Sequence, residues 1–508
     1  MDLVVGIDSS TTSTKAIAFD RGGRAVAEGR AAVPLRSPRA GWFEQEPEDW
    51  WESLRAALRD LTRHVDPARV RALAVANQRE TVGFLDAEGR SVRPAILWLD
   101  ERCREDIDLL SAALGRERLL AITGKAPDPT PSVYSLHWLA RCEPRNVERT
   151  AHVVDPHGYL SWRLTGERAT SWGSADPHGV YDLGRMAYAH EVIRAAGFRP
   201  EQFFPAVRPG TVIGELTPEA AAATGLAPGT RVVAGGGDGQ ASGLGTGVLG
   251  PGRAYHNLGT ASVSGVYSAA YRTGQAFRTL TSLSGEGYIL ELCLRTGSFL
   301  TDWVVTRLFG IDPKADPGCY DRLEREAAAV PPGAEGLLLL PYWSGCMPPW
   351  WDPDARGALV GLGAGHGRGH VYRALMESIA LDEAMGLEAV EAATGERVDE
   401  IVMIGGGARS ALWRQIVADA TGKPLPVSET VEATCLGAVM LAAVGAGWFA
   451  DAREAARAMR GAIRLTVEPD PGRHARYREI LAAYRELYPA LRASFARLAA
   501  LRRQGEAA

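Results

Sequence analysis

Four polar segments carry most of the residues that could do chemistry, and each follows an apolar stretch typical of a buried strand. In the first, Asp8 precedes the hydroxyl-rich turn 9–14 and Lys15. Amides and hydroxyls of such a turn can contact phosphate oxygens, and a carboxylate at a strand end can hold Mg²⁺. The sequence contains no G-x-x-x-x-G-K-[ST] loop. Taken alone, this segment is more simply explained as a polar hairpin without a function.

Asp238 is the second candidate, and it follows the triple glycine 235–237. Glycines allow a ligand to approach the backbone, and a carboxylate at the carboxyl end of a strand faces the crevice where α/β proteins bind ligands. Phosphoryl transfer needs a base of this kind aimed at the acceptor hydroxyl. An Asp in a Gly-rich turn is nevertheless common as a structural feature.

The remaining two segments suit a polyhydroxylated ligand and a nucleotide. Gln78, Arg79 and Glu80 place a donor fork beside an acceptor at a strand end, although a surface ion pair explains them equally well. The segment 405–409, Gly-Gly-Gly-Ala-Arg, lies between a predicted strand and a predicted helix, which is a nucleotide-contact geometry. A lone triple glycine is a weak signal, so the argument depends on all four segments together.

The elements that must position these residues form two similar halves. In the first half, apolar stretches at 3–7, 16–19 and 25–27 predict an antiparallel meander, and a helix at 50–63 precedes a strand at 70–76. In the second half, strands are predicted at 231–234, 255–258 and 263–267, with the turn Gly259-Thr260 between the last two. This weak symmetry indicates two related α/β domains that each offer a loop to a shared cleft.

The last third alternates helices and strands, which predicts an α/β layer. The predicted helices are 370–391, 411–420, 433–444 and 474–503, and the predicted strands are 400–404 and 425–427. Gly and Pro cluster within 244–251, where we expect the domain boundary.

Length, charge and cysteine usage exclude several classes of function. The chain has 508 residues, 46% hydrophobic and 23% charged, so two large domains are expected. A net charge of −5 without a long basic stretch argues against a nucleic-acid partner. Six scattered cysteines without a C-x-x-C pair favour a reducing compartment. No signal peptide is recognised, and the apolar stretch 435–447 is too short for a membrane span, so a cytoplasmic location is expected.

In this order and spacing, the segments resemble the FGGY carbohydrate kinases over nearly the whole chain. The resemblance is carried by residues 41–51, 94–100, 235–240, 340–345, 352–357 and 404–410, the last being the most specific pattern. It implies an α/β protein with two actin-like, hexokinase-like (ribonuclease H-like) ATPase domains flanking a nucleotide cleft. It also implies an N-terminal sugar- and phosphate-binding domain at 1–247, a C-terminal nucleotide-binding domain at 248–508, and the cofactors ATP and Mg²⁺.

The resemblance further implies a role for each matching residue. Asp238 would be the catalytic base, and Asp8 and Asp238 would flank the magnesium ion. Phosphate loops and the adenosine border would be formed by Thr11, Thr12, Ser13, Lys15, Gly259, Thr260, Gly297, Gly407 and Ala408. The substrate would be faced by Gln78, Arg79, Glu80, Asp238 and Gln240.

The substrate is divided between two interpretations. The segments 41–51, 235–238 and 405–410 look like xylulose kinases, but they lie mostly in the scaffold and nucleotide half. The segment 77–81 looks like glycerol kinases and lies at the sugar, and Gln240 and the run 348–351 favour the same interpretation. We therefore expect a ketopentose such as D-xylulose first, and glycerol or another polyol, a tetritol or pentitol, as the alternative.

Departures from the family pattern concern the substrate end. Ser135 stands where the family has a lysine, and the segment 345–349 replaces a usual xylulose-kinase motif. Thr130 stands where glycerol kinases have an aromatic substrate contact, so we expect a roomier pocket.

A remote alternative is an actin-like ATPase that phosphorylates no sugar. The Arg79-Glu80 pair argues against it, because such an ATPase positions a water rather than a sugar. The expected partner is a small sugar or polyol, with no nucleic acid and no membrane, and a homodimer is compatible with the sequence.

Overall fold

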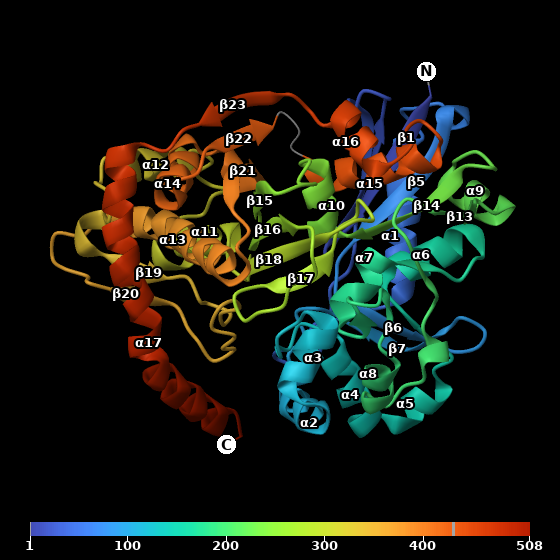
Figure 1. The fold of residues 1–508 in the computed structure, drawn as a ribbon, viewed down its shortest axis with the longest axis horizontal. Coiled ribbons are helices and arrows are strands. Elements are labelled where there is room, and N and C mark those ends of the chain that lie inside the picture. The colour runs from blue at the N-terminus through green and yellow to red at the C-terminus, as the bar shows by residue number, and fades with distance from the viewer. Residues whose placement is uncertain (1, 429–431, 508) are drawn as a thin grey trace.

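Two large sheets lie side by side in the computed structural model, which describes residues 2–428 and 432–507 (Figure 1). The first sheet has the strand order β13-β14-β5-β1-β2-β3, and the second has the order β17-β18-β16-β15-β21-β22-β23. The strands of the first are β1 (Leu3–Ser9), β2 (Ser13–Phe19), β3 (Ala25–Ala32), β5 (Val70–Asn77), β13 (Val212–Glu215) and β14 (Arg231–Gly237). Those of the second are β15 (Gly252–Leu258), β16 (Ser262–Ser268), β17 (Arg278–Thr281), β18 (Tyr288–Leu294), β21 (Val398–Ile404), β22 (Leu425–Ser428) and β23 (Ile463–Val467).

Both sheets repeat one connectivity, as the sequence predicted. Strand β1 pairs antiparallel with β2 and parallel with β5. Strand β15 pairs antiparallel with β16 and parallel with β21 in the same way. Each half therefore places a tight turn beside the carboxyl ends of parallel strands, which is the edge where α/β proteins bind ligands.

Helix α1 (Pro47–Leu61) covers one face of the first sheet, against β2 and β3. It begins with a proline in its first turn, and Glu46 and Asp49 form a capping box. Trp50, Leu54 and Leu58 recur at helical spacing and are fully buried, so this face of the helix forms the core of the first half. Helices α6 (Pro156–Thr165) and α9 (Pro218–Thr224) pack beside α1.

The opposite face of the first sheet is covered by helices from the end of the chain. These are α15 (Ala433–Gly445) and α16 (Ala452–Met459), together with α10 (Asp238–Gly245). Close approach requires Gly6, since a Cβ there would lie 2.1 Å from the carbonyl oxygen of Cys435. Residues on both sides of the predicted boundary within 244–251 thus share one core.

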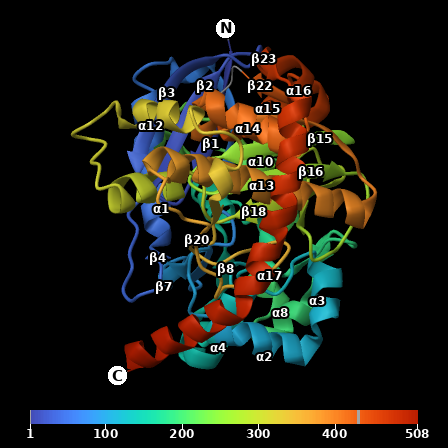
Figure 2. The ribbon, with the colours of Figure 1, turned by 90° about the vertical axis from the view of Figure 1, so that its left-hand side faces the viewer.

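In the second half, helix α13 (Arg368–Thr394) is the central element and is buried along most of its length. It packs against α12 (Cys319–Ala328), α14 (Ala411–Thr421), α11 (Ser298–Trp303) and α17 (Pro471–Ala507). Helix α17 runs along the outer side of this half, and its C-terminal end extends past the neighbouring helices (Figure 2). The small sheet β19 (Leu338–Leu340) and β20 (Ala358–Val360) lies between α13 and α17.

A smaller part of the first half has its own core (Figure 1, lower right). Its sheet is β4 (Glu44–Gln45), β7 (Ser91–Ile96), β6 (Val82–Leu85) and β8 (His152–Val154). Its helices are α2 (Arg104–Leu114), α3 (Arg116–Thr123), α4 (Val133–Cys142), α5 (Pro144–Arg149), α7 (Trp172–Ala175) and α8 (His190–Ala195). Short pairs are formed by β9 (Thr170–Ser171) with β12 (Ala206–Val207) and β10 (Tyr181–Asp182) with β11 (Ala187–Tyr188).

Within the described ranges, no helix combines the length and apolarity needed to cross a bilayer. Each helix and strand predicted from the sequence is present, and most of them begin or end one to four residues outside the predicted bounds.

Candidate active site

The carboxyl ends of three parallel strands gather the candidates of the first half. In the parallel ladders of β1, β5 and β14, Asp8 lies opposite Ala76 and Gly237 lies opposite Asn77. Asp8 is therefore close to the segment 78–80 that follows β5 and to Asp238 at the start of α10.

Asp8 carries a buried oxygen, Oδ1, with no hydrogen-bond partner among the described residues. Burial and, next, the charge of Asp238 raise the pKa of Asp8 to about 7. Two carboxylates that repel each other across a phosphate-binding edge fit a divalent cation, which supplies the missing positive charge. Mg²⁺ is usually held by one or two carboxylates plus substrate phosphates. The described residues contain no cluster of three His, Cys, Asp or Glu that could hold a metal ion.

Asp238 is held by two donors while its side chain stays 40% exposed. The Gly239 N–H donates to Oδ1 at 2.7 Å, and Arg79 Nε lies 3.0 Å from the same oxygen. Both donors favour a carboxylate whose other oxygen is open to the cleft. This geometry suits a base that accepts a proton from a bound hydroxyl.

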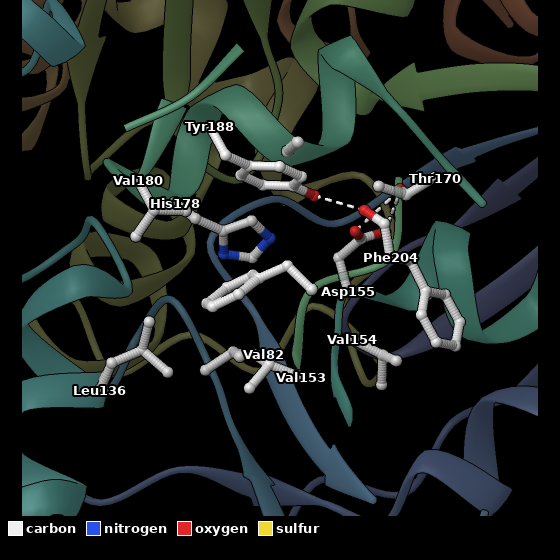
Figure 3. A pocket seen from close by; sticks show the side chains of 12 residues that line it. Val82, Leu136, Val153, Val154, Asp155, Thr170, His178, Val180, Tyr188 and Phe204 are labelled. Atoms are coloured by element: carbon white, nitrogen blue, oxygen red, sulfur yellow. Dashed lines mark hydrogen bonds between the residues drawn. The ribbon is translucent and has the colours of Figure 1, made fainter. Parts of the chain in front are cut away.

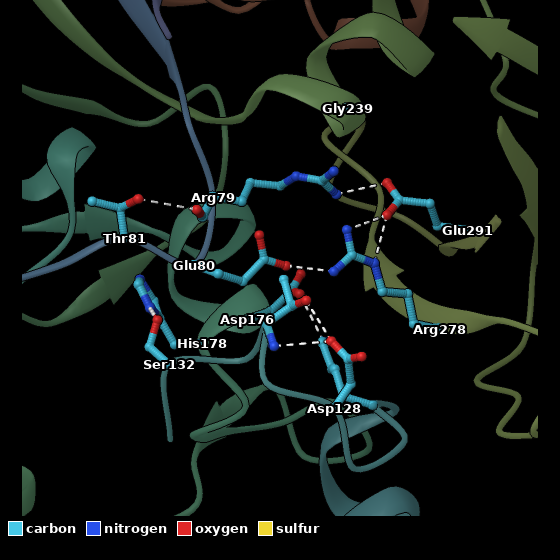
Figure 4. Close-up of polar contacts among 12 residues, drawn as sticks. Arg79, Glu80, Thr81, Asp128, Ser132, Asp176, His178, Gly239, Arg278 and Glu291 are labelled. Atoms are coloured by element: carbon cyan, nitrogen blue, oxygen red, sulfur yellow. Dashed lines mark hydrogen bonds and ion pairs between the residues drawn. The ribbon is translucent and has the colours of Figure 1, made fainter. Parts of the chain in front are cut away.

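A buried ion network of Arg79, Glu80, Arg278 and Glu291 joins the two halves of the molecule (Figure 4), and Asp238 pairs with its Arg79. Arg79 Nη1 donates to Glu291 at 2.6 Å, and Arg278 Nε donates to the other oxygen of Glu291 at 2.6 Å. Arg278 Nη1 donates to Glu80 at 2.7 Å. Burial opposes ionisation of Glu291, but Arg278 and Arg79 outweigh it and hold its pKa below the ordinary value.

Arg79 and Glu80 belong to the first half, whereas Arg278 and Glu291 are paired neighbours on β17 and β18 of the second. The network therefore joins the two halves of the molecule. Glu80 has a left-handed backbone with φ of 49°, which is unusual for a residue with a side chain and concentrates at functional sites. The sequence analysis identified Arg79 and Glu80 but missed Arg278 and Glu291.

The triple glycine makes room for protein, not only for a ligand. A Cβ on Gly235 would lie 2.0 Å from the carbonyl oxygen of Val75, and a Cβ on Gly237 would lie 2.5 Å from Arg79 Cδ. These glycines let β14 and the Arg79 side chain pack closely, and this packing aims the guanidinium at Asp238.

Gln78 and Gln240 are both buried, and the structure uses them differently. Gln78 Nε2 donates to Gln45 at 2.9 Å and its Oε1 accepts from Thr81 at 3.3 Å, so both ends of its amide have protein partners. Gln240 Nε2 donates to Asp176 at 3.2 Å, but its Oε1 has no partner among the described residues. Gln240 therefore has one buried amide oxygen that no described residue satisfies, whereas both ends of the Gln78 amide are held by protein.

A second buried ion pair lies next to this network and was not predicted. Lys125 Nζ donates to Asp176 at 2.9 Å and to the carbonyl oxygen of Thr279 at 2.8 Å. The second oxygen of Asp176 accepts from the Thr281 N–H at 2.7 Å. The pair fixes β17, and with it Arg278, against the first half.

The turn 9–14, the first candidate phosphate loop, is anchored to the smaller part of the same half. Trp98 Nε1 donates to Thr11 Oγ1 at 2.9 Å, and Gln45 Nε2 donates to the Thr11 carbonyl at 2.6 Å. Thr12 and Ser13 are exposed at the tip of the turn. Lys15 forms an ion pair with Glu432, so its ammonium group is shared with the second half. Trp98 was missed because it lies far from this turn in sequence.

The turn 259–260, the second candidate phosphate loop, lies at the ends of β15 and β21. The residues predicted to border the adenosine, Gly297, Gly407 and Ala408, lie there too. The Gly297 N–H donates to the Thr260 carbonyl at 2.8 Å. A Cβ on Gly297 would lie 2.5 Å from the Gly259 carbonyl, and one on Gly407 would lie 2.4 Å from the Leu258 side chain. A hollow of about 590 Å³ adjoins Ala408; it is lined by Met403, Ile404, Gly405, Ala408, Arg409, Arg414, Val427, Ser428, Arg464 and Leu465.

The space beside Thr130 is filled, although a roomier pocket was expected there. Arg295 Nη2 donates to Thr130 Oγ1 at 2.9 Å and to Asp128 at 2.9 Å. Arg295 comes from the second half. Its side chain contacts Thr130, at the position where glycerol kinases have an aromatic residue.

A small cavity in the first half is lined by apolar and polar side chains, among them Val82, Leu136, Asp155 and Thr170 (Figure 3). Its volume is about 10 Å³, which is room for one water molecule. His178 lines it and binds Ser132 at 2.8 Å, and burial lowers the pKa of His178 to about 4. The cavity is part of the core, and no sugar fits in it.

Two α/β halves of the same connectivity, joined by a buried ion network, define a two-domain actin-like ATPase fold. The FGGY family of carbohydrate kinases matches along the chain, its N-terminal domain at residues 3–245 and its C-terminal domain at 254–446. This chain belongs to the FGGY family, and it is a carbohydrate kinase.

Relatives with different substrates are similarly distant. The chain is 31% identical to the xylulose kinase of Escherichia coli, covering 96% of this chain and 99% of that protein. It is 31% identical to the glycerol kinase of Ralstonia nicotianae, covering 91% and 93%. The crystal structure of xylulose kinase from Rhodospirillum rubrum matches with a TM-score of 0.88 at 30% identity, covering 97% of this chain and all of that one.

Proposed function

We propose that this chain transfers the γ-phosphoryl group of ATP to a hydroxyl of a small neutral sugar, with a ketopentose such as D-xylulose as the first candidate. The observation that carries this proposal is the charge of the buried site. Three cations, Arg79, Lys125 and Arg278, are each paired with carboxylates, namely Asp176, Asp238, Glu80 and Glu291.

The formal charge of this cluster is −1, from three cations and four carboxylates. An acidic sugar would bring a further negative charge into a low-dielectric site without a free cation, which is costly. A neutral polyhydroxylated substrate instead exchanges hydrogen bonds with Glu80, Arg79 and the free Oε1 of Gln240. The cluster therefore supports a sugar or polyol over a sugar acid.

The mechanism that we propose uses Asp238 as the base. A substrate hydroxyl gives its proton to Asp238 as its oxygen attacks the γ-phosphorus, and the bond to the β-phosphate oxygen breaks to release ADP. Mg²⁺, held by Asp8 and Asp238, would neutralise charge on the phosphate oxygens when bound. The turns 11–13 and 259–260 donate amides and hydroxyls to the phosphates, with Lys15 adding charge.

We place the adenosine against Gly297, Gly407 and Ala408. The adjoining hollow of about 590 Å³ has the size of a nucleoside site. The domain assignment 1–247 and 248–508, the cytoplasmic location and the homodimer stay predictions.

Glycerol or a longer polyol is the second candidate, since the segment 77–81 resembles glycerol kinases at the residues nearest the sugar. A coupled assay of ADP release across D-xylulose, D-ribulose, glycerol, tetritols, pentitols and gluconate separates the candidates. The highest kcat/KM is expected for a ketopentose, and gluconate should be inactive. Highest kcat/KM for a polyol would favour the second candidate, and ATP turnover that ignores every added sugar would contradict the kinase assignment.

A further inference from the structure

A second basic hollow lies at the end of α10 opposite to Asp238. It measures about 290 Å³ and is lined by Gly247, Leu249, Gly250, Arg253, Arg453, Ala456, Arg457 and Arg460. Half of these residues are arginines, and none is acidic. An eight-residue helix spans about 12 Å, so the hollow is separated from the catalytic carboxylates by the length of α10.

Two of the arginines are held by main-chain carbonyls of the segment 246–251, which connects α10 to β15 and is called the linker below. Arg453 Nη1 donates to the Leu249 carbonyl, and its Nη2 donates to the Tyr267 hydroxyl at 3.2 Å. Arg253 Nη1 donates to the Gly247 carbonyl at 3.2 Å. Guanidinium groups held in this way lose little freedom when an anion binds, which favours binding.

The other two arginines carry uncompensated charge. Arg457 and Arg460 are exposed, and the described residues provide neither of them with a hydrogen bond or an ion pair. Positions 453, 457 and 460 follow the spacing i, i+4, i+7 along and just past α16, so they share one face of the helix. Four guanidinium groups around one hollow repel each other, and a bound anion would relieve that repulsion.

We propose that this arginine hollow binds a small phosphorylated molecule and that the binding is transmitted to the catalytic helix. Guanidinium groups match phosphate oxygens in charge and in bidentate geometry. The size of the hollow is that of a small ester and not of a polymer. Glu286 and Glu400 pair with Arg453 and Arg253 at its rim, and the chain is acidic overall, which disfavours an extended polyanion.

The link to the catalytic helix is made by main-chain hydrogen bonds. The Gly247 N–H donates to Leu244 and the Val248 N–H donates to Gly243, so the linker is tied to the last turn of α10. Helix α10 contacts α16 and begins with Asp238 (Figure 1). A ligand that joins the linker to α16 therefore restrains one end of the helix whose other end carries the base.

Calorimetry on the full chain saturated with MgADP tests binding, because the nucleotide then occupies the phosphate turns of the cleft. The probes are inorganic phosphate and ribose 5-phosphate. Wild type and the charge-matched control Arg63→Ser/Arg185→Ser should bind saturably, and Arg457→Ser/Arg460→Ser should bind at least about tenfold more weakly. A preference for one probe identifies free phosphate or an ester as the ligand.

Equal binding by the Arg457→Ser/Arg460→Ser variant, or no saturable binding by wild type, would overturn the proposal. Turnover without a probe should be the same in all three proteins, and the probe should change kcat or KM only in wild type and the control. Binding without any kinetic change would overturn the link to α10. Calorimetry needs no sugar turnover, so its outcome is independent of the sugar kinase assignment.

Discussion

Asp238 is the residue on which the chemistry depends most, because it is oriented by Gly239 and Arg79 and still open to the cleft. Asp238→Asn keeps the shape and the two donors nearby but removes the proton acceptor. We expect kcat to fall by about 10²–10⁴, with the affinity for ATP nearly unchanged in a fluorescent-nucleotide titration. The exposed Asp399→Asn serves as control. Retention of more than about a tenth of the wild-type rate would remove Asp238 from the role of base.

Glu80 is the second residue whose change gives a specific signature. One oxygen of its carboxylate accepts from Arg278 at 2.7 Å, and we propose that the other accepts from a substrate hydroxyl. Glu80→Ala should raise the sugar KM by about ten- to a hundredfold, since a hydrogen bond to a charged group contributes roughly 1.5–3 kcal/mol. The KM for ATP should change little. An unaltered sugar KM would place Glu80 in the scaffold, and Glu88→Ala on the nearby surface is the matched control.

The residues found from sequence and those missed differ in a physical way. Asp8, Asp238, Arg79 and Glu80 follow apolar stretches, so a reader can place them at strand ends. Arg278 and Glu291 lie inside strands, and they meet only because β17 and β18 pair in the register that sets them opposite each other. Nothing local in the sequence fixes that register, and the same holds for Arg295 beside Thr130.

Among the elements, α13 and β16 share a buried carboxyl that makes stability depend on pH. Ser264 Oγ donates to Glu383 at 2.6 Å, and the other oxygen, Oε1, is buried 4.0 Å from His256 Nδ1 and has no hydrogen bond among the described residues. Burial, opposed by the Ser264 hydrogen bond, raises the pKa of Glu383 from 4.5 to about 7. Between these values the folded protein binds more protons than the unfolded chain, so the free energy of unfolding falls as pH rises through this window.

Glu383→Gln should therefore be more stable than wild type above pH 7, by on the order of 3 kcal/mol, and the difference should vanish below pH 4.5. Urea unfolding of the protein without ligands on both sides of the window measures this. Glu388→Gln, on the same helix but near the surface, should show no such dependence. A difference that is constant with pH would mean that the Glu383 carboxyl does not titrate in this range.

The elements themselves could be predicted because apolar stretches and glycine turns are local signals. Helix α15 shows the limit of this approach. Its sequence is apolar on all sides, which indicates burial, but the pattern does not say which sheet covers it. The structure places it on the first sheet, against Gly6, although it follows β22 of the second. A boundary within 244–251 therefore divides the sequence into two segments, but it does not divide the structure into two separate cores.

At the scale of the whole molecule, the buried ion network of Arg79, Glu80, Arg278 and Glu291 bears on how the two halves could move. Arg79 and Glu80 are bound to Glu291 and Arg278 without any ligand, so the halves are already joined at that point. We therefore expect any closure to be a rotation about this network that brings the turn 259–260 toward the turn 11–13. Such closure excludes water and limits futile hydrolysis of ATP.

Solution X-ray scattering tests this rotation. With a non-hydrolysable ATP analogue, Mg²⁺ and the sugar together, the radius of gyration should be smaller than that of the free protein, and the sugar alone should have a lesser effect. We expect the ion network to act as the pivot of this rotation. Glu291→Gln removes one charge from the network, so it should broaden the range of open conformations and reduce the decrease in the radius of gyration. The exposed control Glu454→Gln lies outside the cleft and should behave as wild type. An unchanged radius with both ligands would mean that the halves are rigid and that water is excluded by the side chains already in place.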